Sequence, residues 1–128
     1  MLHNDLRRMA LTACALGVAL HLYTALFEVE GGPSAFVVGL LVWSCLPYVI
    51  AAVLGTRGKL PAIALGAALG ALAGDLLMHY SVFVAPQGST AALGLLFMPL
   101  WNLLLLAPAG AAIAWALARW RRRVPPGL

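Results

Sequence analysis

Two ionisable residues, Asp75 and His79, interrupt a long apolar stretch between Leu60 and Ala85. About 20 apolar residues are enough for a helix to cross a bilayer, so this stretch is long enough to span one. A carboxylate and an imidazole inside such a span are costly and usually serve a function. Because the two residues are four positions apart, both side chains lie on one face of a helix. This pair is the first candidate for chemistry.

Polar residues from the other apolar stretches are expected to converge near this pair. Depth counted at about 1.5 Å per residue from the outer helix ends places His21 level with His79, and Asp75 about one turn deeper. Indole N–H groups at mid-membrane depth are expected to find partners inside the protein. The predicted polar core beside Asp75 contains Trp43, Trp101 and Asn102, and Glu28 follows His21 on the same helix face.

These residue types are compatible with three kinds of site. His21, Asp75, His79 and the nearby Glu28 offer the nitrogen and oxygen ligands that suit copper, zinc or iron. A haem or quinone between His21 and His79 is a weaker alternative, because haem needs the two imidazoles to stand well apart. In a second hypothesis Asp75 exchanges a proton or cation within the low-dielectric bundle. In a third, the polar groups only hydrogen-bond one another and lock the helices together.

The composition indicates an integral membrane protein. Hydrophobic residues make up 63% of the 128 residues and charged residues 9%, and the mean hydropathy is +0.97. Soluble domains carry about 25% charged residues. The length leaves room for little besides spanning helices, so we expect a single transmembrane domain over residues 1–128.

Four transmembrane helices are expected, and turn-forming Gly and Pro residues separate them. Their expected ranges are about 6–27, 34–54, 60–85 and 90–118. Pro61 suits the first turn of the third helix, and Ser89 or Thr90 suits the N-cap of the fourth. Pro99 and Pro108 are expected to kink the fourth helix. Because the connections are short, the fold class predicted is all-α, an antiparallel up-down-up-down bundle.

The distribution of charge predicts the orientation. All the basic residues fall at one end of the predicted bundle, whereas the other end carries Glu28 and Glu30; the basic residues are Arg7, Arg8, Arg57, Lys59, Arg119, Arg121, Arg122 and Arg123. Cytoplasmic loops carry the excess of Lys and Arg. We therefore expect a multi-pass protein of the inner (cytoplasmic) membrane with both termini in the cytoplasm and an uncleaved first helix. The same placement explains the basic residues without nucleic acid as a partner.

The third helix carries a face of small residues. Gly66, Gly70 and Gly74 repeat every four positions, and small residues let helix backbones approach closely in lipid. The leucines form a separate stripe that is expected to meet lipid; they are Leu65, Leu69, Leu72 and Leu76. The glycine face is expected to pack against other helices, within this chain, in a second copy or in a larger membrane complex.

Two classes of function follow. In the first, the protein binds or moves a cation or proton through a polar site in the outer half of the bundle. In the second, it is an accessory or assembly subunit of a larger membrane complex, and its polar core is purely structural. The sequence contains no HExxH, GxSxG or P-loop motif, which favours a non-enzymatic role. We favour the first class, because Asp75 and His79 are expensive to bury for packing alone.

Overall fold

The computed structural model describes residues 2–28, 31, 34–58, 60–86, 88 and 93–123. All regular structure within these residues is helical. Four helical runs are long and apolar enough to cross a membrane, and they comprise Leu2–Glu28, Ala35–Thr56, Pro61–Val84 and Leu93–Arg121. The expectation of an all-helical chain with four potential spans is therefore confirmed.

Three of the four runs contain a five-residue π-helical turn. The first run consists of α1 (Leu2–Tyr23) and η1 (Thr24–Glu28), and the second is the single helix α2 (Ala35–Thr56). The third run consists of α3 (Pro61–His79) and η2 (Tyr80–Val84). The fourth consists of α4 (Leu93–Trp101), η3 (Asn102–Leu106) and α5 (Ala107–Arg121).

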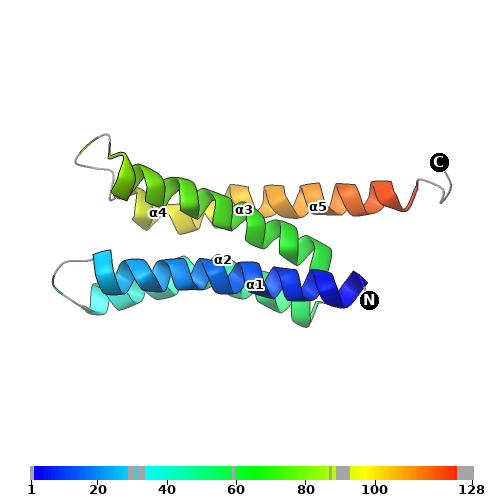
Figure 1. The fold of residues 1–128 in the computed structure, drawn as a ribbon, viewed down its shortest axis with the longest axis horizontal. Coiled ribbons are helices and arrows are strands. Elements are labelled where there is room, and N and C mark those ends of the chain that lie inside the picture. The colour runs from blue at the N-terminus through cyan, green and yellow to red at the C-terminus, as the bar shows by residue number, and fades with distance from the viewer. Residues whose placement is uncertain are drawn as a thin grey trace.

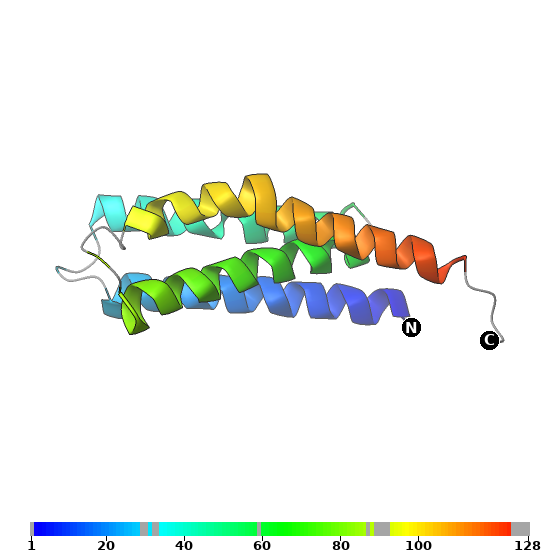
Figure 2. The same cartoon turned by 90° about the horizontal axis from the view of Figure 1, so that it is seen from above.

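The four runs lie lengthwise beside one another, and the two chain termini lie at the same end (Figure 1). Helix α3 is central, because it contacts α1, α2, α4 and α5. The view from above shows α5 extending beyond the other helices at the end that carries the termini (Figure 2). The centre of α3 is thus the place where residues of all four runs can meet.

The helix ends differ from the expected ranges by a few residues. Helix α1 begins at Leu2 rather than near residue 6, because polar residues continue it and Asp5 in its first turn suits the positive end of the helix dipole. Ser34 caps α2 by accepting a hydrogen bond from the Val37 N–H at 3.2 Å. Pro61 occupies the first turn of α3. Several predicted features lie outside the described residues, namely the caps Ser89 and Thr90 and the charged residues Glu30 and Lys59.

The fourth run bends between its two prolines. Pro99 lies inside α4 and Pro108 at the start of α5, and the π-helical turn η3 separates them. Figure 2 shows the change of direction between α4 and α5. Proline lacks an N–H and crowds the preceding turn, so the regular hydrogen-bond ladder cannot pass through these positions. The wider turn of η3 accommodates this interruption of the hydrogen-bond ladder.

Small residues fill the bundle on the side of the termini. The buried core there consists of the small residues Ala13, Cys14, Ala51, Ala67, Ala68 and Ala71, together with the larger Tyr48. On another face of α3, an added Cβ on Gly66 would overlap the backbone carbonyl of Gly110 in α5. Of the leucine stripe, Leu69 and Leu76 are exposed, whereas Leu72 packs against the core. The stripe is thus only partly a lipid-facing surface, because α3 has neighbours on most of its circumference.

Candidate functional site

Asp75 lies at the centre of a buried hydrogen-bond network and is completely inaccessible to solvent. His21 Nε2 lies 2.9 Å from Asp75 Oδ2, and the Tyr48 hydroxyl donates to the same oxygen. Asn102 Nδ2 donates to Asp75 Oδ1 at 2.9 Å. These partners come from α1, α2 and η3, so side chains from all four helical runs meet at one carboxyl group. A buried carboxylate needs such donors to be tolerated.

The ring of His79 lies beside that of His21, with the two ring centroids 5.6 Å apart. Its Nδ1 lies 2.7 Å from the backbone oxygen of Asp75. Because a carbonyl oxygen can only accept, Nδ1 must carry a hydrogen. Its Nε2 lies 2.8 Å from Thr24 Oγ1. Within this arrangement, only Nε2 of the ring can be either protonated or unprotonated.

Thr24 allows His79 to keep a hydrogen bond at Nε2 whether the ring is neutral or charged. Thr24 Oγ1 lies 3.0 Å from the Leu20 backbone oxygen as well as within reach of His79. When His79 is neutral, the hydroxyl donates to Nε2. When His79 is protonated, Nε2–H donates to Oγ1, and the hydroxyl turns to the carbonyl of Leu20. A rotation of one hydroxyl hydrogen thus accommodates the proton.

A cavity of about 260 Å³ adjoins the network. Polar residues on its wall are His21, Thr24, Glu28, Ser44 and His79. The remaining lining is apolar and comes from η1, α2, η2 and α4. These elements meet at the end of the bundle opposite to the termini (Figure 1). Toward the termini, the small-residue core fills the bundle instead.

The π-helical turns occur beside the polar network. η1 begins with Thr24, η2 follows directly after His79, and η3 begins with Asn102. Such turns are rare and appear frequently at functional sites. Each one shifts the register of its helix just where a network residue must point inward.

A glycine makes room for the Tyr48 side chain. An added Cβ on Gly17 would overlap the ring of Tyr48, and Gly17 lies one helical turn before His21 on α1. The missing side chain lets the tyrosine ring cross the helix interface and bring its hydroxyl to Asp75. The side chain at this position of α1 therefore decides whether α2 can contribute to the network.

No known protein family, curated protein or solved structure matches this chain. Function must therefore be inferred from the side chains. Among the described residues, no group of three or more His, Cys, Asp or Glu side chains is arranged to hold a metal ion. Both ring nitrogens of His79 and Nε2 of His21 already lie within hydrogen-bond distance of protein groups. A metal site at His21, Asp75, His79 and Glu28 stays a prediction.

The structure brings together four of the residues singled out from the sequence, which are His21, Asp75, His79 and Asn102. Glu28 lies on the cavity wall but is exposed and outside the network. Trp101 differs from the expected polar core, because its side chain is 54% exposed. It directly precedes Asn102, and neighbouring residues on a helix point about 100° apart. Trp43 is partly exposed and donates its indole N–H to the Leu96 carbonyl at 3.3 Å.

Two members of the site, Tyr48 and Thr24, were not predicted from the sequence. Counted along its helix, Tyr48 lies in the half of the bundle nearer the termini, yet its long side chain reaches Asp75. Its helix face carries a signal, because Ser44, Ala51 and Gly55 share it at helical spacing and all are buried. Thr24 follows His21 by three residues and so shares its face. Small or polar residues at helical spacing mark a packed face more reliably than depth alone.

Proposed function

We propose that the chain crosses the inner membrane four times as an antiparallel up-down-up-down bundle with both termini in the cytoplasm. We further propose that Asp75, His21 and His79 form a site that binds and releases protons. The observation that carries this proposal is that His21 is hydrogen-bonded to the Asp75 carboxylate, His79 lies beside His21, and both imidazoles line the same cavity. In the proposed orientation that cavity faces the outer side of the membrane.

The geometry supplies two places for a proton. One is the contact between His21 Nε2 and Asp75 Oδ2, where the proton can reside on either partner. The other is His79 Nε2, where Thr24 accommodates either state. Tyr48 and Asn102 hold the carboxylate in place through the exchange. The small-residue core closes the path toward the cytoplasm, so this conformation supports exchange with one side only.

A cation is the second possible occupant of the cavity. Glu28 and Ser44 add oxygen ligands to the imidazoles on the cavity wall. Copper, zinc or iron would suit this mixture of donors if His79 turned away from Thr24. Metal analysis of the purified protein tests this alternative directly, since a bound ion should be retained by wild type and lost in His79→Ala.

Histidine NMR tests the proton site. The chain contains three histidines, His3, His21 and His79, so ¹⁵N-histidine spectra in lipid nanodiscs are simple to assign with single variants. We expect the ring nitrogens of His21 and His79 to change protonation reversibly as the bulk pH changes. In Asp75→Asn, His21 Nε2 loses its carboxylate partner, so the His21 spectra should differ from wild type, whereas His79 keeps its hydrogen bond to the backbone oxygen of residue 75.

The matched control is Asp5→Asn, which makes the same chemical change at an exposed position of α1. Asp5→Asn should leave the spectra of His21 and His79 unchanged. Exposed His3 supplies the internal reference for a ring in contact with bulk water. If His21 and His79 keep constant spectra while His3 titrates, the site does not exchange protons and the proposal is wrong.

One observation favours the alternative role as an accessory or assembly subunit. Within the described residues, Asn102 Oδ1 is the sole buried side-chain nitrogen or oxygen without a hydrogen-bond partner, as expected of a structural polar core. In that role the lipid-facing surface would contact a larger membrane complex or a second copy. In that role the His21 and His79 spectra of the wild-type protein would stay constant as the pH changes, and the protein would co-purify with partner chains in mild detergent.

A further inference from the structure

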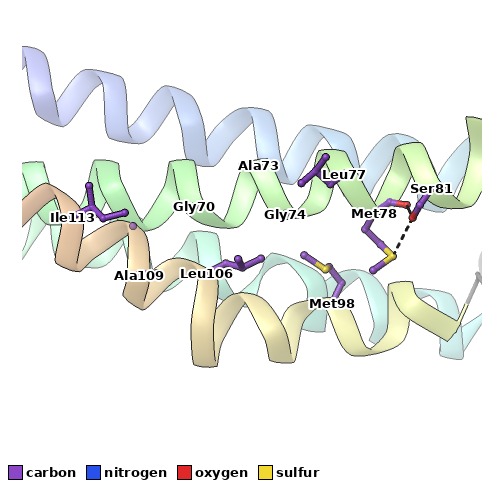
Figure 3. A pocket seen from close by; sticks show the side chains of 11 residues that line it. Gly70, Ala73, Gly74, Leu77, Met78, Ser81, Met98, Leu106, Ala109 and Ile113 are labelled. Carbon is purple, nitrogen blue, oxygen red and sulfur yellow. Dashed lines mark hydrogen bonds between the residues drawn. The ribbon is translucent and has the colours of Figure 1, made fainter.

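A second hollow borders α4 and shares the Met98 side chain with the polar cavity. It is a groove of about 500 Å³ between α3 and the α4–α5 run, with almost entirely apolar walls. Figure 3 shows Met98 and Leu106 on one wall and Met78 and Leu77 on the other, with Gly70 and Gly74 along α3. The volume falls within the range of about 300–1,000 Å³ that small-molecule sites occupy.

A buried hydrogen-bond acceptor without a partner lies beneath the floor of this groove. Asn102 is 1% exposed, and its Oδ1 has no partner among the described residues although its Nδ2 donates to Asp75. An added Cβ on Gly74 would lie 3.0 Å from this oxygen. Gly74 lines the groove and Asn102 does not, so the oxygen lies beneath the groove at Gly74, where the side-chain ends of Leu106 and Met98 also lie. A buried acceptor without a donor costs free energy of folding, which a suitable ligand would recover.

Met98 separates the acceptor from the groove and the groove from the polar cavity. It is the one residue that lines both hollows, and its side chain is almost fully buried. A methionine side chain is unbranched and adaptable, so it can move aside more easily than a branched residue. Displacing it would expose the floor at Gly74 to a molecule arriving from the lipid.

We propose that this groove binds a membrane-soluble molecule with an apolar body and a terminal hydroxyl group, and that the hydroxyl donates to Asn102 Oδ1. The apolar walls exclude a charged ligand, and the lone acceptor selects for a donor over a plain hydrocarbon. Binding at this groove does not depend on proton exchange at His21 and His79. The histidine spectra can therefore refute proton exchange, and the binding measurement can refute binding at the groove, independently of each other.

The test compares three probes of similar size on the chain in phosphatidylcholine nanodiscs, with empty discs subtracting partition into lipid. 4-Hexylphenol carries a hydroxyl donor, 4-hexylanisole carries only an acceptor, and hexylbenzene carries neither. By calorimetric titration the wild-type protein should bind the phenol about fivefold to tenfold more tightly than the other two, as expected for one hydrogen bond. Equal affinity for all three probes would overturn the proposal.

Gly74→Ala places a methyl group over the floor, where it would meet the mobile ends of Leu106 and Met98 and then Asn102 Oδ1. In this variant the preference for the phenol should disappear. Gly39→Ala is the matched control, because an added Cβ there meets no atom within 4 Å, and it should keep the wild-type preference. A preference that survives in Gly74→Ala would place the phenol elsewhere and would overturn the assignment to this groove.

Discussion

At the scale of single residues, the chemistry is concentrated on one carboxyl group with donors from three other helical runs. The convergence of His21, Asp75 and His79 could be predicted, because ionisable residues in apolar helices have to face inward. The contribution of Tyr48 could not, since it depends on the rotation of α2 and on the space left by Gly17. The side chain of a tyrosine covers more than one helical turn, which makes a depth count too coarse.

Tyr48→Phe isolates the hydroxyl that reaches Asp75. The ring still fills the space beside Gly17, so the variant should fold, while a buried carboxylate loses one donor. A hydrogen bond to a charged group contributes about 1.5–3 kcal/mol. We expect the free energy of unfolding, measured by denaturant titration in detergent, to fall by that amount.

Tyr23→Phe is the control for this change, because it removes the same hydroxyl from an exposed position on α1. Its free energy of unfolding should stay within about 0.5 kcal/mol of wild type. Equal stability of Tyr48→Phe and Tyr23→Phe would show that the hydroxyl of Tyr48 does not support Asp75.

At the scale of the helices, the four long apolar helical runs could be predicted from the sequence, and their ends were displaced by only a few residues. The π-helical turns could not be predicted, because they arise where packing of polar residues overrides the regular ladder. The glycine face of α3 was expected to contact another helix, and in the structure Gly66 and Gly70 lie against α5 of the same chain. At Gly66 that face is therefore covered by Gly110 of the same chain, whereas Gly70 and Gly74 also line the open groove.

Gly66→Ala tests how tightly α3 and α5 depend on this contact. Its new methyl group would overlap the backbone oxygen of Gly110, and backbone cannot move aside as a side chain can. The two helices would have to separate, and overpacking of this kind costs about 1–3 kcal/mol. We expect a lower thermal midpoint by circular dichroism in detergent.

Gly39→Ala again provides the comparison, since its methyl group meets open space and alanine favours a helix over glycine by about 1 kcal/mol. This control should be as stable as wild type or more so. If Gly66→Ala were equally stable, the close approach of α3 and α5 would not describe the folded protein.

At the scale of the whole molecule, the ends of the bundle differ in charge and in access to the polar site. The basic residues of α1 and α5 lie at the end that carries the termini, and the polar cavity lies toward the other end. By the positive-inside rule we propose that the basic end lies in the cytoplasm. Orientation and direction of access are thus linked, because reversing the molecule would open the cavity to the cytoplasm.

Cysteine labelling decides between the two orientations. In a Cys14→Ala, Cys45→Ala background, Gly88→Cys places a thiol at the cavity end, and Leu2→Cys places one at the terminal end. A membrane-impermeant maleimide should label Gly88→Cys in intact spheroplasts, but Leu2→Cys only after permeabilisation. The reverse pattern would refute the cytoplasmic placement of the termini. Because the cavity turns with the bundle, that result would also mean that the cavity beside His21 and His79 faces the cytoplasm.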